Sequence, residues 1–262
     1  MTGGGAWAPG EWTDDTALAL CLAESIAERG LLDTGDLAAR YIAWARTGKG
    51  IGRTTRSALR RATDEADARA RAQAFHAATG KSATNGTVMR AAPIGLAATS
   101  VESAARSARE DALLTHHDPA AGAASAALCA ALVAIRQGDD PIDAAEAQIG
   151  DHDRLREVMR AVRGRDESMI AALAGGPEKG SCWTTLGVGL FALGADGYER
   201  GVLWAIALGG DTDTNAAVAG ALLGCRHGPD SIPERWRRQL REKERIEWAA
   251  RALAEIGLRT GA

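Results

Sequence analysis

Apolar positions recur every three or four residues along most of this chain, which is the spacing of amphipathic helices. The pattern is clear between Thr13 and Arg29, and Gly30 follows it as a helix stop signal. Residues 36–47 and 54–62 repeat the pattern on either side of a glycine-rich break. The sequence therefore predicts helices over all three segments.

The rest of the chain is patterned in the same way. Further helices are predicted over residues 63–77, 92–98, 100–115, 119–136, 184–193, 198–208 and 215–225. Residues 119–136 carry almost no charge, so this helix should lie at the centre of the core. Charged residues are mixed with spaced apolar ones over 141–173 and 233–257, as in helices that cover a core.

Composition supports one helical domain. Long proline-free, alanine-rich segments and an aromatic content of 4% favour helices over strands. The 262 residues are 46% hydrophobic, enough for a single large core, and no linker or fixed repeat divides them. We therefore expect residues 1–262 to form a compact, single-domain, all-α orthogonal multi-helix bundle.

The charge balance and the cysteines argue against several classes of protein. A net charge of −3 creates no overall field that would attract nucleic acid. No apolar stretch reaches the roughly 20 residues that span a bilayer, and the N-terminus does not have the pattern of a signal peptide. The four cysteines, at positions 21, 129, 182 and 225, lack CxxC spacing. These features predict a reduced, cytoplasmic protein without a membrane segment.

Two motifs of acids and hydroxyls open apolar helices, Thr-Asp-Asp-Thr at 13–16 and Gly-Gly-Asp-Thr-Asp-Thr-Asn at 209–215. Either motif alone is most simply a helix cap, because Asp and Thr are ordinary capping residues. Together they supply carboxylates from separate segments, which is what paired Mg²⁺ or Mn²⁺ ions require. If the motifs meet in space, cations must offset the repulsion among these carboxylates. The acids are Asp14, Asp15, Asp211 and Asp213.

Three other places carry weaker signals. The run Asn-Gly-Thr-Val-Met-Arg at 85–90 could offer backbone N–H groups to a diphosphate, although an ordinary turn followed by a cap explains it as well. His116 and His117 precede the apolar helix that starts at Pro119, and such a pair is more often solvated than functional. Trp183 could stack on an adenine or ribose, or simply pack in the core.

Taken in order, four motifs resemble the ADP-ribosylglycohydrolase family. They are Gly-Glu-Trp-Thr-Asp-Asp-Thr at 10–16, Asn-Gly-Thr-Val-Met-Arg-Ala-Ala-Pro at 85–93, Thr-His-His-Asp-Pro at 115–119 and Leu-Gly-Gly-Asp-Thr-Asp-Thr-Asn at 208–215. The resemblance implies a compact all-α fold with a dinuclear cleft for two Mg²⁺ or Mn²⁺ ions. The ligands that it implies are Thr13, Asp14, Asp15, Asp211, Asp213 and Thr214.

The same resemblance implies the substrate and the reaction. The expected enzyme cleaves the glycosidic bond between ADP-ribose and a protein side chain or small acceptor. Separately from the resemblance, we expect a monomer. Asp15 and Asp211 are the candidates for assisting proton transfer. The residues expected to contact ADP-ribose are Asn85, Gly86, Thr87, Met89, His116 and, as an aromatic side chain beside the nucleotide, Trp183. An ADP-ribosylated nucleic-acid end stays open as a substrate, although nucleic acid is not the expected partner.

The chain also departs from the pattern that it resembles. Members of the family usually carry a glycine-rich helix and a glutamate-bearing loop before the Thr-Asp-Asp motif, whereas here twelve residues precede Thr13. We expect the domain to lack that N-terminal helix, either because the chain starts upstream of this sequence or because the helix has been lost. Lys81 stands where some members have an acidic residue. Two alternatives therefore remain: a non-catalytic protein that binds Mg²⁺ and ADP-ribose, or another Mg²⁺-dependent hydrolase of nucleotides or sugar phosphates.

Overall fold

The computed structural model describes residues 3–259, and within these residues it is built from fifteen α-helices and one short 3₁₀-helix, without strands. The all-α prediction is confirmed. In chain order the α-helices are α1 Asp14–Arg29, α2 Thr34–Ala45, α3 Arg53–Leu59, α4 Glu65–Thr79, α5 Ala92–Ala97, α6 Val101–Leu113, α7 Pro119–Gln137, α8 Pro141–Glu146, α9 Asp153–Arg163, α10 Glu167–Gly175, α11 Cys182–Ala192, α12 Tyr198–Ala207, α13 Thr212–His227, α14 Glu234–Arg237 and α15 Lys243–Arg259.

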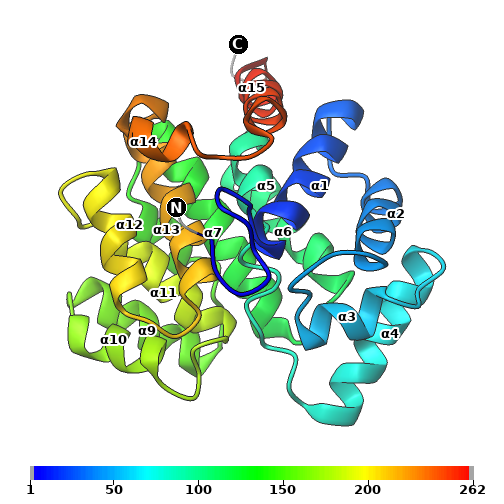
Figure 1. Ribbon diagram of the computed structural model, residues 1–262. Coiled ribbons are helices and arrows are strands. Elements are labelled where there is room, and N and C mark those ends of the chain that lie inside the picture. Colours follow the sequence, from blue (N-terminus) through cyan, green and yellow to red (C-terminus); the bar gives the residue numbers. More distant parts are fainter. Residues whose placement is uncertain (1–2, 260–262) are drawn as a thin grey trace.

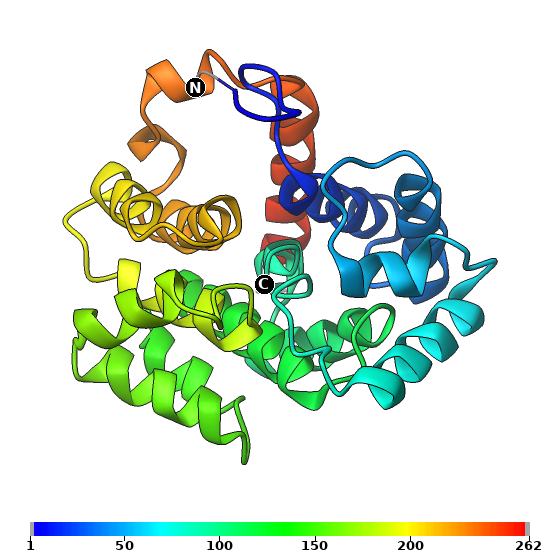
Figure 2. The same cartoon turned by 60° about the horizontal axis from the view of Figure 1, so that its bottom comes forward.

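Helix α7 forms the centre of the molecule, as its lack of charge predicts. It packs against α5, α6, α8, α11 and α13. Figure 1 shows α2 to α4 on one side of α7 and α9 to α12 on the other, and Figure 2 shows the same division from below. Among the described helices, α7 alone is long and apolar enough to cross a membrane, but 83% of its apolar window is buried inside the protein. A buried core helix is often as long and as apolar as a helix that crosses a membrane.

Local signals in the sequence set the ends of α7. The carboxylate of Asp118 accepts a hydrogen bond of 3.0 Å from the backbone N–H of Ala120, and Pro119 occupies the first turn, where its missing N–H costs nothing. Gly138 ends the helix with a φ of 82°, a left-handed conformation that favours glycine.

Helix ends elsewhere differ from the predicted ones by at most three residues, and one difference affects the site. Helix α13 begins at Thr212 and not at Asn215, so the prediction was wrong there. Gly209 and Gly210 adopt φ values of 73° and 72°, and this tight turn lets the helix start directly afterwards. As a result, Asp213 lies in the first helical turn.

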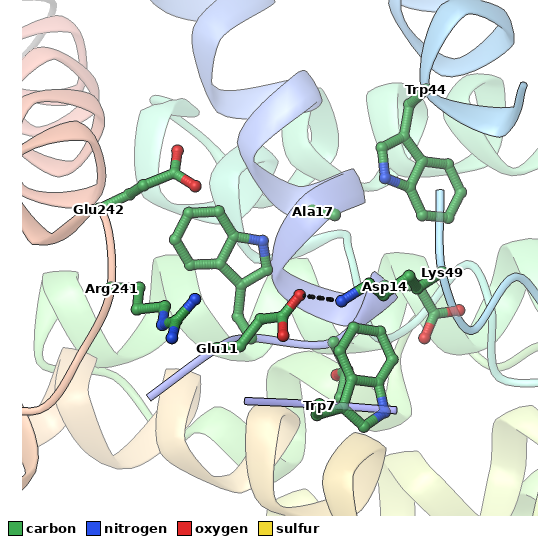
Figure 3. Close-up of a pocket in the computed structure, with 10 residues that line it drawn as sticks. Trp7, Glu11, Asp14, Ala17, Trp44, Lys49, Arg241 and Glu242 are labelled. Carbon is green, nitrogen blue, oxygen red and sulfur yellow. Dashed lines mark hydrogen bonds and ion pairs between the residues drawn. The ribbon is translucent and has the colours of Figure 1, made fainter. Parts of the chain in front are cut away.

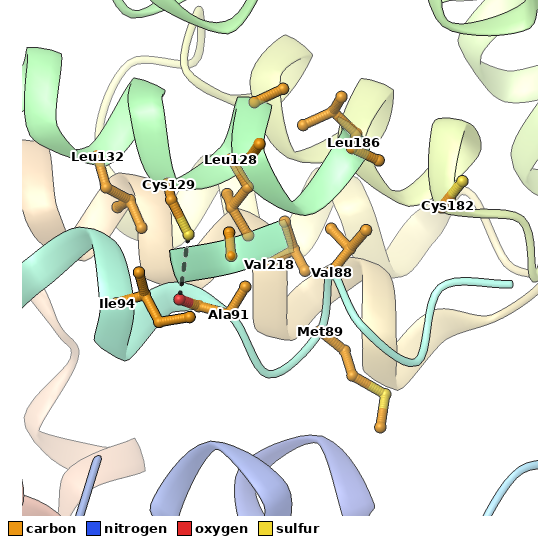
Figure 4. Packing of buried hydrophobic residues seen from close by; sticks show 14 of the residues in the cluster. Val88, Met89, Ala91, Ile94, Leu128, Cys129, Leu132, Cys182, Leu186 and Val218 are labelled. Carbon is orange, nitrogen blue, oxygen red and sulfur yellow. Dashed lines mark hydrogen bonds between the residues drawn. The ribbon is translucent and has the colours of Figure 1, made fainter. Parts of the chain in front are cut away.

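The irregular segment between α4 and α5 is packed onto this core. Val88 is completely buried, and Figure 4 shows it directed toward α7 and α11, while Met89 is directed away from them. The thiol of Cys129 on α7 donates to the backbone oxygen of Ala91 at 3.3 Å. The segment is therefore held on one side by the core, and its other side is left for the site.

Candidate active site

The two acidic motifs, far apart in the sequence, meet in the structure. Asp14 and Asp15 lie in the first turn of α1, and Asp213 lies in the first turn of α13. One carboxylate oxygen from each of the three lies within 4.8 Å of the others, close enough to hold a metal ion. The convergence that the metal hypothesis requires is thus present.

Neither motif uses its side chain to cap its helix. Thr13 is the N-cap residue of α1, but its hydroxyl donates a hydrogen bond of 2.5 Å to Asp15. Asp211 is the N-cap residue of α13, but its carboxylate accepts a hydrogen bond of 2.8 Å from the side-chain amide of Asn85. Helix capping therefore does not account for the two motifs, although the acids do lie where the helix dipoles favour them.

Burial and mutual repulsion disfavour the charged forms of these acids. Burial, together with the charge of Asp15, raises the pKa of Asp14 to about 7. Burial raises the pKa of Asp15 to about 6, although the hydrogen bond from Thr13 opposes the shift. The pKa of Asp211 is also raised, first by burial and then by the charge of Asp213, while the bond from Asn85 lowers it. A bound cation would reverse each of these effects.

One oxygen atom supports a metal site directly. Asp15 is 2% exposed, and its Oδ1 is buried without a hydrogen-bond partner. An unpaired carboxylate oxygen away from water is costly unless a cation or a donor meets it. Since carboxylate and hydroxyl oxygens are the ligands that Mg²⁺ and Mn²⁺ prefer, the residues fit such an ion.

A cavity of about 300 Å³ joins the acidic motifs to the 85–90 segment. Nearly all of its walls come from the two acidic motifs, from the segment that contains Asn85, from α3 and from the glycine-rich loop before α3. The residues that line it are Asp14, Gly50, Gly52, Arg53, Thr54, Thr55, Thr84, Asn85, Gly86, Met89, Gly180, Asp211, Asp213 and Thr214. Seven of the residues predicted from the sequence therefore line one cavity.

Asn85 connects the two sides of this cavity. Besides Asp211, its amide donates to the hydroxyl of Thr185 on α11 at 3.0 Å, and its backbone N–H donates to Gly180 at 3.0 Å. Gly86 follows in a space too small for a side chain, because a Cβ there would lie 3.0 Å from Oγ1 of Thr55. The backbone at this point is open to a ligand on the cavity side.

Comparison with known proteins gives the family. A family model described as ADP-ribosylglycohydrolase matches residues 1–261. The chain belongs to the ADP-ribosylglycohydrolase family. This confirms the resemblance seen in the sequence and the prediction of a hydrolytic enzyme.

Relatives and a solved structure agree with the assignment. The ADP-ribosylarginine hydrolase Tri1 of Serratia proteamaculans (strain 568) is 29% identical, over 97% of this chain and 70% of its own length. The ADP-ribosylhydrolase ARH3 of Danio rerio is 30% identical, over 94% of this chain and 78% of its own. A structure titled "ADP-ribosylglycohydrolase-related protein complex" superposes with a TM-score of 0.75 at 33% identity, covering 98% of this chain and 87% of that chain.

Five residues predicted from the family resemblance lie outside the cavity lining, and His116 is one of them. Asp15 is almost completely buried and lines neither this cavity nor the neighbouring one that Thr13 borders. Thr87 is completely buried, and its hydroxyl donates to the backbone of Ala121 on α7 at 3.2 Å. Trp183 is half-buried, and its ring N–H is buried without a partner. Substrate contact through Thr87 and Trp183 stays a prediction.

His116 occupies the wall between two cavities. It is 1% exposed, and its Nε2 lies 2.8 Å from the hydroxyl of Thr84, which lines the 300 Å³ cavity. On its other side it borders a cavity of about 520 Å³ that His117 and Asp118 also line. Burial lowers the pKa of His116 well below its ordinary value, so the ring is neutral. Its hydroxyl partners fix its orientation.

A second cavity, of about 210 Å³, adjoins the first acidic motif and was not predicted from the sequence. Figure 3 shows Trp7, Trp44 and Glu11 around it, with the carboxylate of Glu11 paired to Lys49 at 2.6 Å. Asp14 lines both cavities. The signal for this cavity in the sequence was the glycine-rich loop before α3, since glycines allow a close approach of the backbone to other groups. In the structure, Gly50 of this loop packs closely against both Asp14 and Trp7.

Proposed function

We propose that this protein hydrolyses the glycosidic bond between ADP-ribose and an acceptor, with the help of divalent cations. The observation that carries this proposal is the convergence of Asp14, Asp15 and Asp213 within 4.8 Å beside a cavity whose other wall is the 85–89 segment. Family membership supports ADP-ribosyl hydrolysis as the reaction, and the cavity beside these acids supports this location for it.

We propose two Mg²⁺ or Mn²⁺ ions as the cofactor. The residues that would hold them are Thr13, Asp14, Asp15, Asp211, Asp213 and Thr214. When bound, such ions neutralise the carboxylates and polarise oxygen atoms of the substrate or of water. The number of carboxylates supports a pair, since two ions need several acids from different segments.

Between the two acids proposed for proton transfer, Asp211 is better placed than Asp15. Asp211 lines the cavity, and the Asn85 amide fixes its Oδ2, whereas Asp15 is almost completely buried and does not line the cavity. Asp211 would accept the proton of a water molecule as that water attacks the anomeric carbon. As the water oxygen bonds to the anomeric carbon, the bond from ribose to the acceptor breaks, and the acceptor leaves with its electron pair and takes up the proton that Asp211 accepted.

The remaining walls suit the nucleotide. Gly86 presents backbone without a side chain, and Arg53 is the one basic residue among the described residues that line this cavity. The Arg53 guanidinium lies 5.4 Å from the ring centre of Phe75. We propose that Arg53 balances the charge of the diphosphate. Thr84, in the same wall, is hydrogen-bonded to His116. Through Thr84, His116 would order the riboses indirectly.

The acceptor would leave toward the second cavity, because Asp14 lines both. The indole rings that line the second cavity, together with the Glu11 carboxylate, would accommodate an acceptor that is a side chain or a small molecule. An arginine-linked ADP-ribose is the first substrate to test, because Tri1 is described as an ADP-ribosylarginine hydrolase.

We also propose a monomer in the cytoplasm. Support for the compartment comes from the cysteines, all four of which are free thiols, with Cys21, Cys129 and Cys182 buried. Reduced, buried cysteines are typical of proteins kept in a reducing environment.

The test combines calorimetry with turnover. The protein is titrated with ADP-ribose with and without Mg²⁺, and hydrolysis of ADP-ribosylarginine is followed, for the parent, Asp211→Ala and the exposed-surface control Asp196→Ala. We expect Mg²⁺-dependent binding and turnover in the parent and the control, and loss of turnover in Asp211→Ala. Binding of ADP-ribose without turnover of any ADP-ribosylated substrate would favour the non-catalytic alternative.

A further inference from the structure

Arg90, the last residue of the Asn-Gly-Thr-Val-Met-Arg motif, is completely buried and has no role in the function proposed so far. All three of its guanidinium nitrogens are used. Nε donates to the carboxylate of Asp111 on α6 at 3.0 Å, and Nη2 donates to the backbone oxygen of the same residue at 3.0 Å. Nη1 donates to the backbone oxygen of Gly86 at 3.1 Å.

Tyr41 on α2 completes this network. Its hydroxyl donates to Oδ1 of Asp111 at 3.0 Å, and its ring centre lies 4.7 Å from the Arg90 guanidinium. Asp111 and Tyr41 are both completely buried as well. The network therefore joins two helices of the scaffold to one backbone oxygen in the wall of the site.

Stability alone does not explain such a network. Removing an ion pair from water costs about as much as the pair regains, and apolar side chains of similar volume often stabilise a core equally well. Apolar side chains cannot, however, donate to the oxygen of Gly86. That oxygen belongs to a run of turns at 85–90, which has no regular helix or strand to fix its position.

We propose that Arg90, held by Asp111, is a positioning residue that sets Asn85 and Gly86 against the acidic motifs. This inference rests on the function proposed above. The amide of Asn85 lies 2.8 Å from Asp211, and Gly86 lines the cavity beside it. A displacement of this backbone by about 1 Å would break that hydrogen bond and misplace the ligand.

Three variants separate positioning from stability. Arg90→Lys keeps the charge but loses the fork that reaches Asp111 and Gly86 together. The double variant Arg90→Met with Asp111→Leu replaces the ion pair by apolar side chains and leaves no buried charge. Tyr41→Phe removes one hydroxyl and keeps the pair. The control is Arg165→Met, which removes a guanidinium that donates to the backbone oxygen of Phe191 and stacks on its ring, away from the site.

Two measurements are made on each variant. The first is the Kd for ADP-ribose in Mg²⁺ by calorimetry, which we expect to rise at least about tenfold for Arg90→Lys and for the double variant, and less than about twofold for the control and Tyr41→Phe. The second is hydrogen exchange of the backbone amides of residues 85–91, which should speed up in the first two variants only. If the double variant does not fold, Arg90→Lys decides.

The outcomes are distinguishable. Unchanged Kd and unchanged exchange at 85–91 in Arg90→Lys, or in a folded double variant, would overturn the positioning role. If the parent itself binds no ADP-ribose, the proposed function fails, and the exchange measurement still decides whether Arg90 fixes this segment. A uniform rise in exchange over the whole chain would mean that Arg90 stabilises the fold without positioning the site, and would also overturn the proposal.

Discussion

The side-chain amide of Asn85 donates a hydrogen bond of 2.8 Å to Oδ2 of Asp211. This single bond joins the 85–90 segment to the second acidic motif. It also orients this carboxylate, and it opposes the rise in the pKa of Asp211 that burial causes. Loop and acidic motif therefore function as one unit.

The first prediction concerns that bond. In Asn85→Ala, Asp211 loses its donor, so its pKa rises further and its orientation is no longer fixed. We expect kcat/KM for an ADP-ribosylated substrate to fall at least about tenfold, with little change in the thermal midpoint. Thr185→Val is the matched control, since it removes the other partner of the same amide and leaves the bond to Asp211. Equal losses in both variants would contradict a special role for the Asn85–Asp211 bond.

The second prediction concerns pH and metal. Burial raises the pKa of Asp14 to about 7 and that of Asp15 to about 6, from an ordinary value of 3.8. A folded protein with raised carboxyl pKa values binds more protons than the unfolded chain, so these groups lower stability as pH rises from about 4 to 7. In EDTA the thermal midpoint should therefore fall over this range, and it should fall less in Asp14→Asn.

Added Mg²⁺ should reverse this trend. Metal binding needs deprotonated carboxylates, so the rise in midpoint on adding Mg²⁺ should grow as pH increases through about 6 to 7. Asp14→Asn should show a smaller rise at every pH. Identical pH profiles for the parent and Asp14→Asn in EDTA would show that the buried acids do not carry the effect.

The third prediction concerns Thr13. Its hydroxyl donates to Asp15 at 2.5 Å, and Asp15 already has one oxygen without a partner. Thr13→Val removes the hydroxyl that donates to Oδ2 of Asp15, and with it a proposed metal ligand. We expect the Kd for Mg²⁺ to rise roughly tenfold, measured by calorimetry. The exposed Thr47→Val should leave it unchanged, and an unchanged Kd in Thr13→Val would exclude Thr13 from the metal site.

The sequence predicted the helices better than the arrangement of the site. Periodicity and capping residues act locally, so the ends of α7 followed from Asp118, Pro119 and Gly138. The meeting of α1 with α13 depends on packing between distant segments, which no local pattern records. The acidic motifs were recognisable only because four carboxylates before two apolar helices need an explanation beyond capping.

Other features were outside the reach of local reasoning for a physical reason. The family resemblance implies that Thr87 contacts ADP-ribose, yet its hydroxyl is directed into the core and donates to Ala121. The second cavity depends on Trp7, in the segment before α1, and on Trp44, on α2, and their proximity to Asp14 arises from packing between distant segments. Arg90 resembles an exposed basic residue until its partner Asp111, on another helix, is known.

The last prediction tests the narrow space at Gly86. A Cβ there would lie 3.0 Å from Oγ1 of Thr55 and 3.0 Å from Cε1 of His116, closer than ordinary contacts, while the backbone φ places no special demand on the residue. Gly86→Ala should cost about 1–3 kcal/mol of stability and weaken ADP-ribose binding, because the backbone must move away from both neighbours. Adding Thr55→Ala removes one of the two contacts and should restore part of the stability.

The matched control is Gly175→Ala, where a Cβ would meet nothing within 4 Å. It lies at the end of α10, and a gain of about 0.5–1 kcal/mol or no change is expected there. Chemical denaturation gives the free energies, and calorimetry gives the Kd for ADP-ribose. If Gly86→Ala behaved like Gly175→Ala in both measurements, the wall formed by Thr55 and His116 would be less rigid than its contacts indicate. The site would then tolerate the backbone shifts that the Arg90 network is proposed to prevent.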